Sequence, residues 1–134
     1  MPAGYSGTPL AKKLGLKDGV KLWASGMPDS VRAEIEESAR PAYVAGPGKA
    51  LPAAHVFHTA KSKLVSDLET LRAALAPDGF VWVSWPKKAA KVESDITEDV
   101  IRAVALPIGF VDIKVCAVDE TWSGLRLVIR KALR

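Results

Sequence analysis

The sequence predicts a single-domain α/β protein, a three-layer sandwich whose mostly parallel sheet ends in an antiparallel C-terminal strand. Strand-like and helix-like segments alternate as far as residue 106, which indicates parallel strands joined by helical crossovers. Residues 80–85 are apolar without alternation, as in a central strand covered on both faces. The last two strands are separated only by Asp119 to Ser123, a link too short for a crossover helix. A chain of 134 residues fits one such domain.

The first half of the chain predicts two helices and short strands. Pro9 and Gly15 bracket a short helix, as a first-turn proline and a C-terminal glycine do. Val31 and Ile35 recur at helical spacing, and closely spaced prolines and glycines then interrupt the pattern. In order, we expect a helical arm at 1–16 with its helix at 10–14, a strand at 20–24, a helix at 29–38, at most one very short strand within 41–54, and a strand at 55–58.

The second half of the chain carries clearer periodicity. Leu64, Leu68 and Leu71 form a stripe along one helix face. Asp95 and Glu98 have the spacing of a capping box at the start of a later helix. In order, we expect a helix at 60–75, a Pro77-Asp78-Gly79 turn, a strand at 80–85, a helix from about 96 to 106, and two alternating strands, with Val111, Ile113, Val115 and Ala117 on one face of the first and Leu125, Leu127 and Ile129 on one face of the second.

Composition is that of an ordinary globular protein, with 49% hydrophobic and 25% charged residues. No apolar run is long enough to span a bilayer, and residues 1–7 do not resemble a signal peptide. We therefore expect a soluble, cytoplasmic protein without a membrane partner. A net charge of +4 permits contact with anions or nucleic acid without requiring it. Cys116, the one cysteine, is expected to be a packing residue in a strand.

Polar residues follow the predicted strands, where open parallel sheets bind their ligands. Lys87 and Lys88, beside Pro86, have the chemistry to hold a phosphate or carboxylate, although a solvated basic loop is the plainer interpretation. Trp122 lies in the hairpin link and would stack on a ring or a partner surface, or pack within the hairpin. The candidate ligand-binding residues are Ser25, Gly26, Ser84, Trp85, Lys87, Lys88, Trp122 and Ser123.

Catalytic signals are few. His58 ends a predicted strand, where it would serve as a general base or as a partly buried polar cap, and Asp119 is a second candidate for proton handling. His55 and His58 are three residues apart, but no further histidine or cysteine set accompanies them, so no metal site is predicted. No P-loop and no Gly-x-Ser-x-Gly motif occurs.

The order of elements resembles the C-terminal half of class I S-adenosylmethionine-dependent methyltransferases. Residues 71–83 look like the helix, turn and strand of that family, and residues 16–20 resemble the lead-in to its first strand. The resemblance implies a Rossmann-like fold and S-adenosylmethionine as a cofactor. Residues 4–10, 85–88 and 118–126 also resemble a family of small bacterial domains of unknown function, which implies no activity.

Two positions depart from the methyltransferase pattern. The segment Ser25-Gly26-Met27-Pro28 has one glycine where that family has several, and no carboxylate occurs between Glu37 and Asp67 to bind ribose hydroxyls. We therefore predict no bound cofactor. The leading hypothesis is a degenerate methyltransferase-like domain that acts as a ligand-binding or regulatory module, with a small anionic ligand or a protein partner.

Alternatives from other functional classes remain open. The first is a small divergent S-adenosylmethionine-dependent methyltransferase. The second is a weak nucleic-acid binder, because Arg126, Arg130, Lys131 and Arg134 gather near the C-terminus and Lys12 and Lys13 near the start, although acidic residues offset this charge. Exposed apolar surface would also allow a homodimer.

Overall fold

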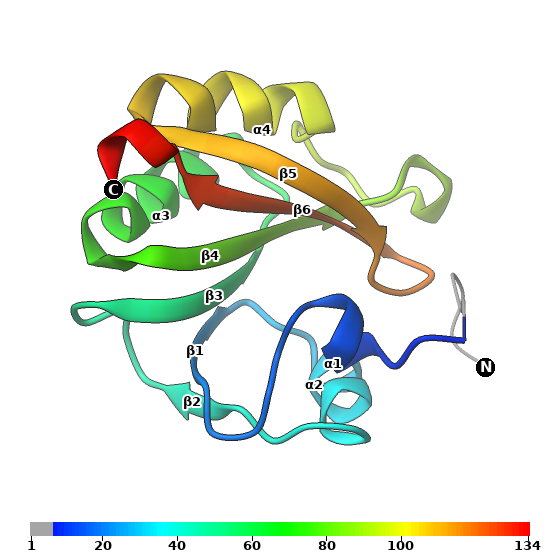
Figure 1. Ribbon diagram of the computed structural model, residues 1–134. Coiled ribbons are helices and arrows are strands. Elements are labelled where there is room, and N and C mark those ends of the chain that lie inside the picture. Colours follow the sequence, from blue (N-terminus) through cyan, green and yellow to red (C-terminus); the bar gives the residue numbers. More distant parts are fainter. Residues whose placement is uncertain (1–6) are drawn as a thin grey trace.

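The computed structural model describes residues 7–134 and shows a six-stranded sheet between two helical layers (Figure 1). Residues 1–6 of the predicted arm therefore lie outside the described residues. The elements are α1 (Leu10–Lys13), β1 (Lys21–Ser25), α2 (Asp29–Glu36), β2 (Ala42–Val44), β3 (Leu51–Phe57), α3 (Lys61–Ala74), β4 (Leu75–Pro86), α4 (Glu98–Ala105), β5 (Phe110–Ala117) and β6 (Trp122–Ile129), with short 3-10 helices at Lys88–Ala90, Leu106–Ile108 and Lys131–Leu133.

The sheet has the strand order β2-β1-β3-β4-β6-β5. The first four strands in that order run parallel, whereas β6 is antiparallel to both β4 and β5. The mostly parallel sheet with an antiparallel C-terminal strand is therefore confirmed. The apolar segment of β4 lies between β3 and β6, and its residues Val81, Trp82 and Val83 are fully buried, which explains its lack of alternation.

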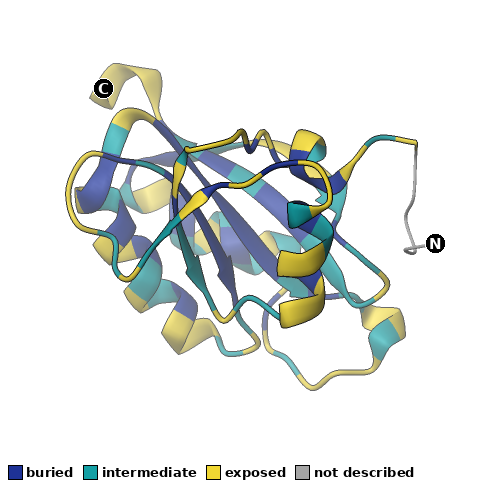
Figure 2. Cartoon of the chain, turned by 90° about the horizontal axis from the view of Figure 1, so that it is seen from below, coloured by how far each residue is buried: buried dark blue, intermediate teal, exposed yellow. Residues whose placement is uncertain are grey.

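Each face of the sheet carries its own core (Figure 2). Helices α1 and α2 cover one face, where Leu14, Leu22 and Ile35 are buried around Trp82. Helices α3 and α4 cover the other face, and the predicted leucine stripe of α3 packs there against Val81 and Val83. Burial of one such leucine contributes about 1.5–3 kcal/mol, so the periodic apolar positions dominate the placement of both layers.

The strands β3 and β4 extend further than the sequence predicts. Leu51 pairs with Leu75 and Ala53 with Phe80, so the Pro77-Asp78-Gly79 turn lies within β4 as an irregularity rather than before it. Gly79 packs so closely on β3 that a Cβ there would lie 2.8 Å from the Leu51 carbonyl oxygen. The register shift between β3 and β4 falls at Pro52, which has no backbone N–H to donate to the neighbouring strand.

The strand β5 contains a bulge that overturns the predicted common face of its apolar residues. Val111 pairs with Val128, but Val115 pairs with Leu125, and the register shifts between Asp112 and Lys114. Positions 125 and 128 lie on opposite faces of the regular strand β6, so Val111 and Val115 do as well. The extra residue at the bulge, Ile113, is exposed.

The start of α4 also differs from the expected capping box. Its N-cap is Thr97, whose hydroxyl oxygen accepts a hydrogen bond from the Val100 N–H at 3.2 Å. The Asp95 carboxylate instead accepts the N–H of Lys61 at 2.7 Å, at the start of α3. The Asp95 side chain therefore bonds the amino end of α3 and not that of α4. Within residues 7–134, no helix has the length and apolar character needed to cross a membrane.

Candidate functional site: a cleft at the switch point of the sheet

The strands β1 and β3 lie side by side, but the chain leaves them in opposite directions. It passes from β1 through α2 to β2, and from β3 through α3 to β4 on the other side of the sheet. A crevice forms at the carboxyl ends of two strands where the connections diverge in this way. A cleft of about 370 Å³ occupies this place, lined by Ser25, Gly26, Phe57, His58, Thr59, Ala60, Lys63 and Trp122. That volume lies within the range of small-molecule sites.

Asp67 of α3 organises the polar side of the cleft. Its Oδ2 lies 2.6 Å from Nε2 of His58, and it accepts a hydrogen bond from the Ser25 hydroxyl at 3.4 Å. Because a carboxylate only accepts hydrogen bonds, neutral His58 carries its proton on Nε2 and leaves Nδ1 as an acceptor. No hydrogen bond to that Nδ1 forms among the described residues. The pair is largely shielded from water, with side-chain exposures of 10% for His58 and 22% for Asp67.

Gly26 brings the loop after β1 onto β3. Its φ of +70° lies in the left-handed region, and a Cβ at this position would lie 2.9 Å from the Phe57 carbonyl oxygen. The glycine is therefore needed for packing of the protein on itself. This contact closes the floor of the cleft between Ser25 and Phe57.

Two aromatic rings also line the cleft. Phe57 and Trp122 meet edge to face with ring centroids 5.2 Å apart. The Asp119 carboxylate holds Trp122 in place, because its Oδ1 accepts the backbone N–H groups of Thr121 and Trp122, both at 2.8 Å. Asp119 therefore shapes the loop that carries the tryptophan.

The amino end of α3 opens onto the same cleft. Ala60 and Lys63 line it, and the first turn of α3 contains no acidic residue. The Asp95 carboxylate already accepts the Lys61 N–H at this helix end, so the group left to attract an anion is the Lys63 ammonium. Lys63 therefore supplies the positive charge at the mouth of the cleft.

Four of the residues predicted from sequence meet in the cleft, namely Ser25, Gly26, His58 and Trp122. The others lie elsewhere. Lys87 donates a hydrogen bond through Nζ to the Asp119 carbonyl oxygen at 2.6 Å, and its N–H donates to the Thr121 carbonyl oxygen at 2.7 Å. Lys87 thereby fastens the loop after β4 to the β5–β6 loop, while Lys88 begins a short 3-10 helix beside it. Asp119 lines a separate hollow with Ser30, Glu34, Glu120 and Thr121.

Ser84 is fully buried, 2.7 Å through its Oγ from Nε2 of His55. Trp85 packs against the core on the α3 and α4 face, and Ser123 pairs with Trp85 across β4 and β6. His55 is also fully buried and stacks on Phe57 with ring centroids 4.3 Å apart. Burial lowers the pKa of His55 from its ordinary value of 6.5 to about 3, so this imidazole is neutral at physiological pH.

The sequence analysis did not identify Asp67, Lys63 or Phe57 as parts of the site. The sequence does contain a signal for Asp67. It follows Leu64 by three residues, which places it on the face of α3 that turns toward the sheet. A carboxylate beside a buried leucine stripe needs a polar partner, and His58 and Ser25 are the partners. Within residues 7–134, no group of three or more histidine, cysteine, aspartate or glutamate side chains is arranged to hold a metal ion.

Several solved structures resemble this chain. The chain superposes on an S-adenosylmethionine-dependent methyltransferase from Aquifex aeolicus with a TM-score of 0.63 and 15% identity, covering 90% of this chain and 87% of the other. The fold is that of the S-adenosylmethionine-dependent methyltransferases.

Two further structures agree. DhpI in complex with SAH gives a TM-score of 0.62 at 10% identity, covering 92% of this chain and 83% of DhpI. Fibrillarin of Aeropyrum pernix with bound S-adenosyl-L-methionine gives 0.54 at 11% identity, covering 89% and 73%. No protein-family model matches the sequence, and no curated protein matches it. At these sequence identities the comparisons show the fold of this chain and not its chemistry.

Proposed function

We propose that this protein is a ligand-binding module on a methyltransferase scaffold, and that its cleft takes a small molecule with a planar ring and an anionic group. The observation that carries the proposal is the composition of the switch-point cleft, in which Ser25 and His58, both held by Asp67, share the lining with Phe57 and Trp122. Apolar walls with a few fixed polar groups are characteristic of small-molecule sites.

Each part of this ligand has a counterpart in the cleft. A planar ring would stack on Trp122, whose own position is fixed by Asp119 and Phe57. An anionic group would lie near the Lys63 ammonium. His58 Nδ1 would accept a hydrogen bond from a hydroxyl or amine of the ligand. These contacts bind and orient a ligand without any cofactor.

The residues of the cleft do not fit an adenosyl cofactor. The strand β2 ends at Val44, and residues 45–50 contain no carboxylate for the ribose hydroxyls. Gly26 approaches Phe57 rather than leaving its space to a ligand, and Pro28 at the start of α2 has no backbone N–H to donate. The module proposed here therefore acts without S-adenosylmethionine.

A divergent methyltransferase is the second candidate, and one observation favours it. Structures of the same fold contain S-adenosyl-L-methionine or SAH, and this chain covers most of their length. In that case His58, oriented by Asp67, would be the residue available to accept a proton from the substrate.

A thermal-shift assay separates the two candidates, because a ligand that binds only the folded state raises its melting temperature. The probes are phenyl phosphate and benzoate, each a ring with one anionic group, and S-adenosylmethionine and S-adenosylhomocysteine. We expect the ring probes to raise the melting temperature and the adenosyl compounds to leave it unchanged. The Lys63→Gln variant should lose most of the shift caused by benzoate, because it removes the cation at the mouth of the cleft.

The matched control is Lys61→Gln, which removes an exposed lysine from the same helix turn, outside the cleft lining. Equal losses in the two variants would show that general charge, rather than the cleft, attracts the probes. A shift with the adenosyl compounds alone would replace the first candidate by the second.

A further inference from the structure

An arginine without a counter-charge lies on the sheet face covered by α1. Nε of Arg126 is buried without a hydrogen-bond partner, and within residues 7–134 no nitrogen of its guanidinium forms a hydrogen bond or ion pair. Its central carbon lies 4.1 Å from the centroid of the Phe80 ring, and a Cβ on Gly15 would lie 3.3 Å from its Nη1. Loss of hydration lowers the pKa of Arg126. Proteins normally offset such a cost with a carboxylate.

A second cation lies directly beside this arginine. Lys114 of β5 is the register partner of Arg126 on β6, and its Nζ lies 5.9 Å from the centroid of the Trp82 ring on the same face. Like charges in facing positions of a sheet repel one another. Asp112, the acidic residue of β5, pairs in register with Leu127 and bonds to Arg102 at 2.9 Å on the opposite face. The strand pair therefore concentrates positive charge here.

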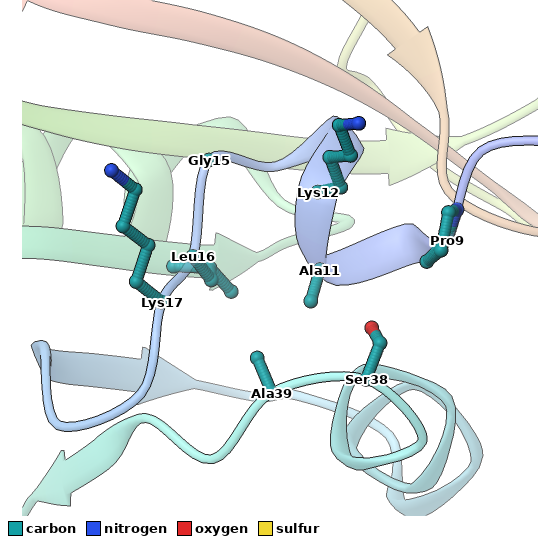
Figure 3. A pocket seen from close by; sticks show the side chains of 8 residues that line it. All are labelled: Pro9, Ala11, Lys12, Gly15, Leu16, Lys17, Ser38 and Ala39. Atoms are coloured by element: carbon teal, nitrogen blue, oxygen red, sulfur yellow. The ribbon is translucent and has the colours of Figure 1, made fainter.

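Two more lysines reach the same corner from the segment before β1. Lys12 and Lys17 line a pocket of about 290 Å³ between α1 and the end of α2. In Figure 3 both side chains extend away from Ser38 and Ala39, and they end on opposite sides of Gly15. Neither lysine forms an ion pair among the described residues. We call Arg126, Lys114, Lys12 and Lys17 the cationic corner.

The cationic corner is separate from the switch-point cleft. The cleft lies at the carboxyl ends of β1 and β3, where Trp122 begins β6. Arg126 lies further along β6 and packs on Phe80, and Gly15 precedes the first residue of β1. Because β6 is antiparallel to β4, this direction leads toward the amino ends of the parallel strands. A ligand at one site would therefore not occupy the other.

We propose that the cationic corner binds a phosphate-type oxyanion. A guanidinium presents a planar fork of N–H donors that matches the oxygens of phosphate, and the ammonium group of its register partner Lys114 supplies further charge beside it. A dianion would replace the missing carboxylate of Arg126 and relieve its repulsion with Lys114. The same chemistry is offered by free inorganic phosphate and by the phosphate group of a larger metabolite.

The test is isothermal titration calorimetry with inorganic phosphate and with glycerol 3-phosphate at constant ionic strength. The Arg126→Met variant removes the charge that lies over Phe80 and leaves an unbranched apolar side chain to pack on the ring. We expect it to weaken phosphate binding at least about tenfold, and to melt without phosphate no lower than the wild type, because an unpaired charge has gone. Lys114→Gln, at an exposed position, should weaken binding severalfold and tests the corner if the arginine variant does not fold.

Lys131→Gln is the matched control, since it removes one exposed positive charge from the C-terminal segment, away from the corner. We expect it to bind phosphate as the wild type does. Equal weakening in Lys131→Gln and Lys114→Gln, or no phosphate binding by the wild type, would overturn the proposal. Tighter binding of glycerol 3-phosphate would identify the phosphate as part of a larger molecule, and equal binding would identify free phosphate.

Discussion

His55 shows how the fold controls the charge of a single side chain. The imidazole is fully buried, its Nε2 lies 2.7 Å from the Ser84 hydroxyl oxygen, and its Nδ1 has no hydrogen-bond partner. No acidic side chain of the described residues bonds to it, so protonation inside the protein gains nothing that offsets the loss of hydration. The residue acts as a polar packing group of β3, unlike its neighbour His58.

The stability of the protein should therefore depend on pH through His55. Well above pH 6.5 the His55 imidazole is neutral in both the folded and the unfolded protein, so its full contribution to the free energy of unfolding is present. Between pH 6.5 and about 3 the unfolded chain binds a proton that the folded protein does not, so the free energy of unfolding falls as the pH is lowered. The expected slope from this residue is about 1.4 kcal/mol per pH unit.

Urea denaturation at several pH values measures this slope. The His55→Gln variant, which keeps a polar partner for Ser84, should lose this part of the pH dependence even if it is less stable at pH 7. Parallel pH profiles for the wild type and His55→Gln would contradict the buried, neutral state.

At the scale of single elements, the start of α4 depends on one hydroxyl. Thr97 caps the helix by accepting the Val100 N–H. Replacement of an N-cap threonine by alanine removes that acceptor and typically costs about 1 kcal/mol. We expect Thr97→Ala to lower the free energy of unfolding by about this amount in urea titrations. Ser38→Ala, at an exposed position just after the end of α2, should change it far less.

The elements were predictable where the pattern is local. The leucine stripe of α3 and the uninterrupted apolar run of β4 each predict the correct element, because periodicity reports directly on burial. The bulge at Ile113 was not predictable, since it depends on how β5 matches β6 after pairing. The cap of α4 was misplaced because Asp95 is used by Lys61, a residue 34 positions away.

At the scale of the whole molecule, the sheet order decides where the candidate site lies. Ser25, Gly26 and His58 were predictable because each follows a strand, and parallel strands end at one edge. Lys87 looked similar in sequence, but its side chain is used to bond Asp119, 32 residues away. Asp67 lies on α3 rather than after a strand. Only the folded arrangement brings its carboxylate to His58 and Ser25. The polar residues that follow strands could be predicted as site candidates, whereas tertiary contacts determine which of them lie in the cleft.

The central claim is that the switch-point cleft is the ligand site, and an NMR titration of ¹⁵N-labelled protein with phenyl phosphate tests it most directly. The account predicts that backbone amide shifts will change at Ser25, Gly26, His58 and Thr59 and at the Trp122 indole N–H, saturating together with one dissociation constant, in addition to changes around Arg126 that inorganic phosphate also causes. Changes at Gly15, Lys114 and Arg126 alone would mean that only the phosphate moiety is recognised, at the cationic corner. That result, or no change around the cleft at saturating probe, would contradict the proposed function.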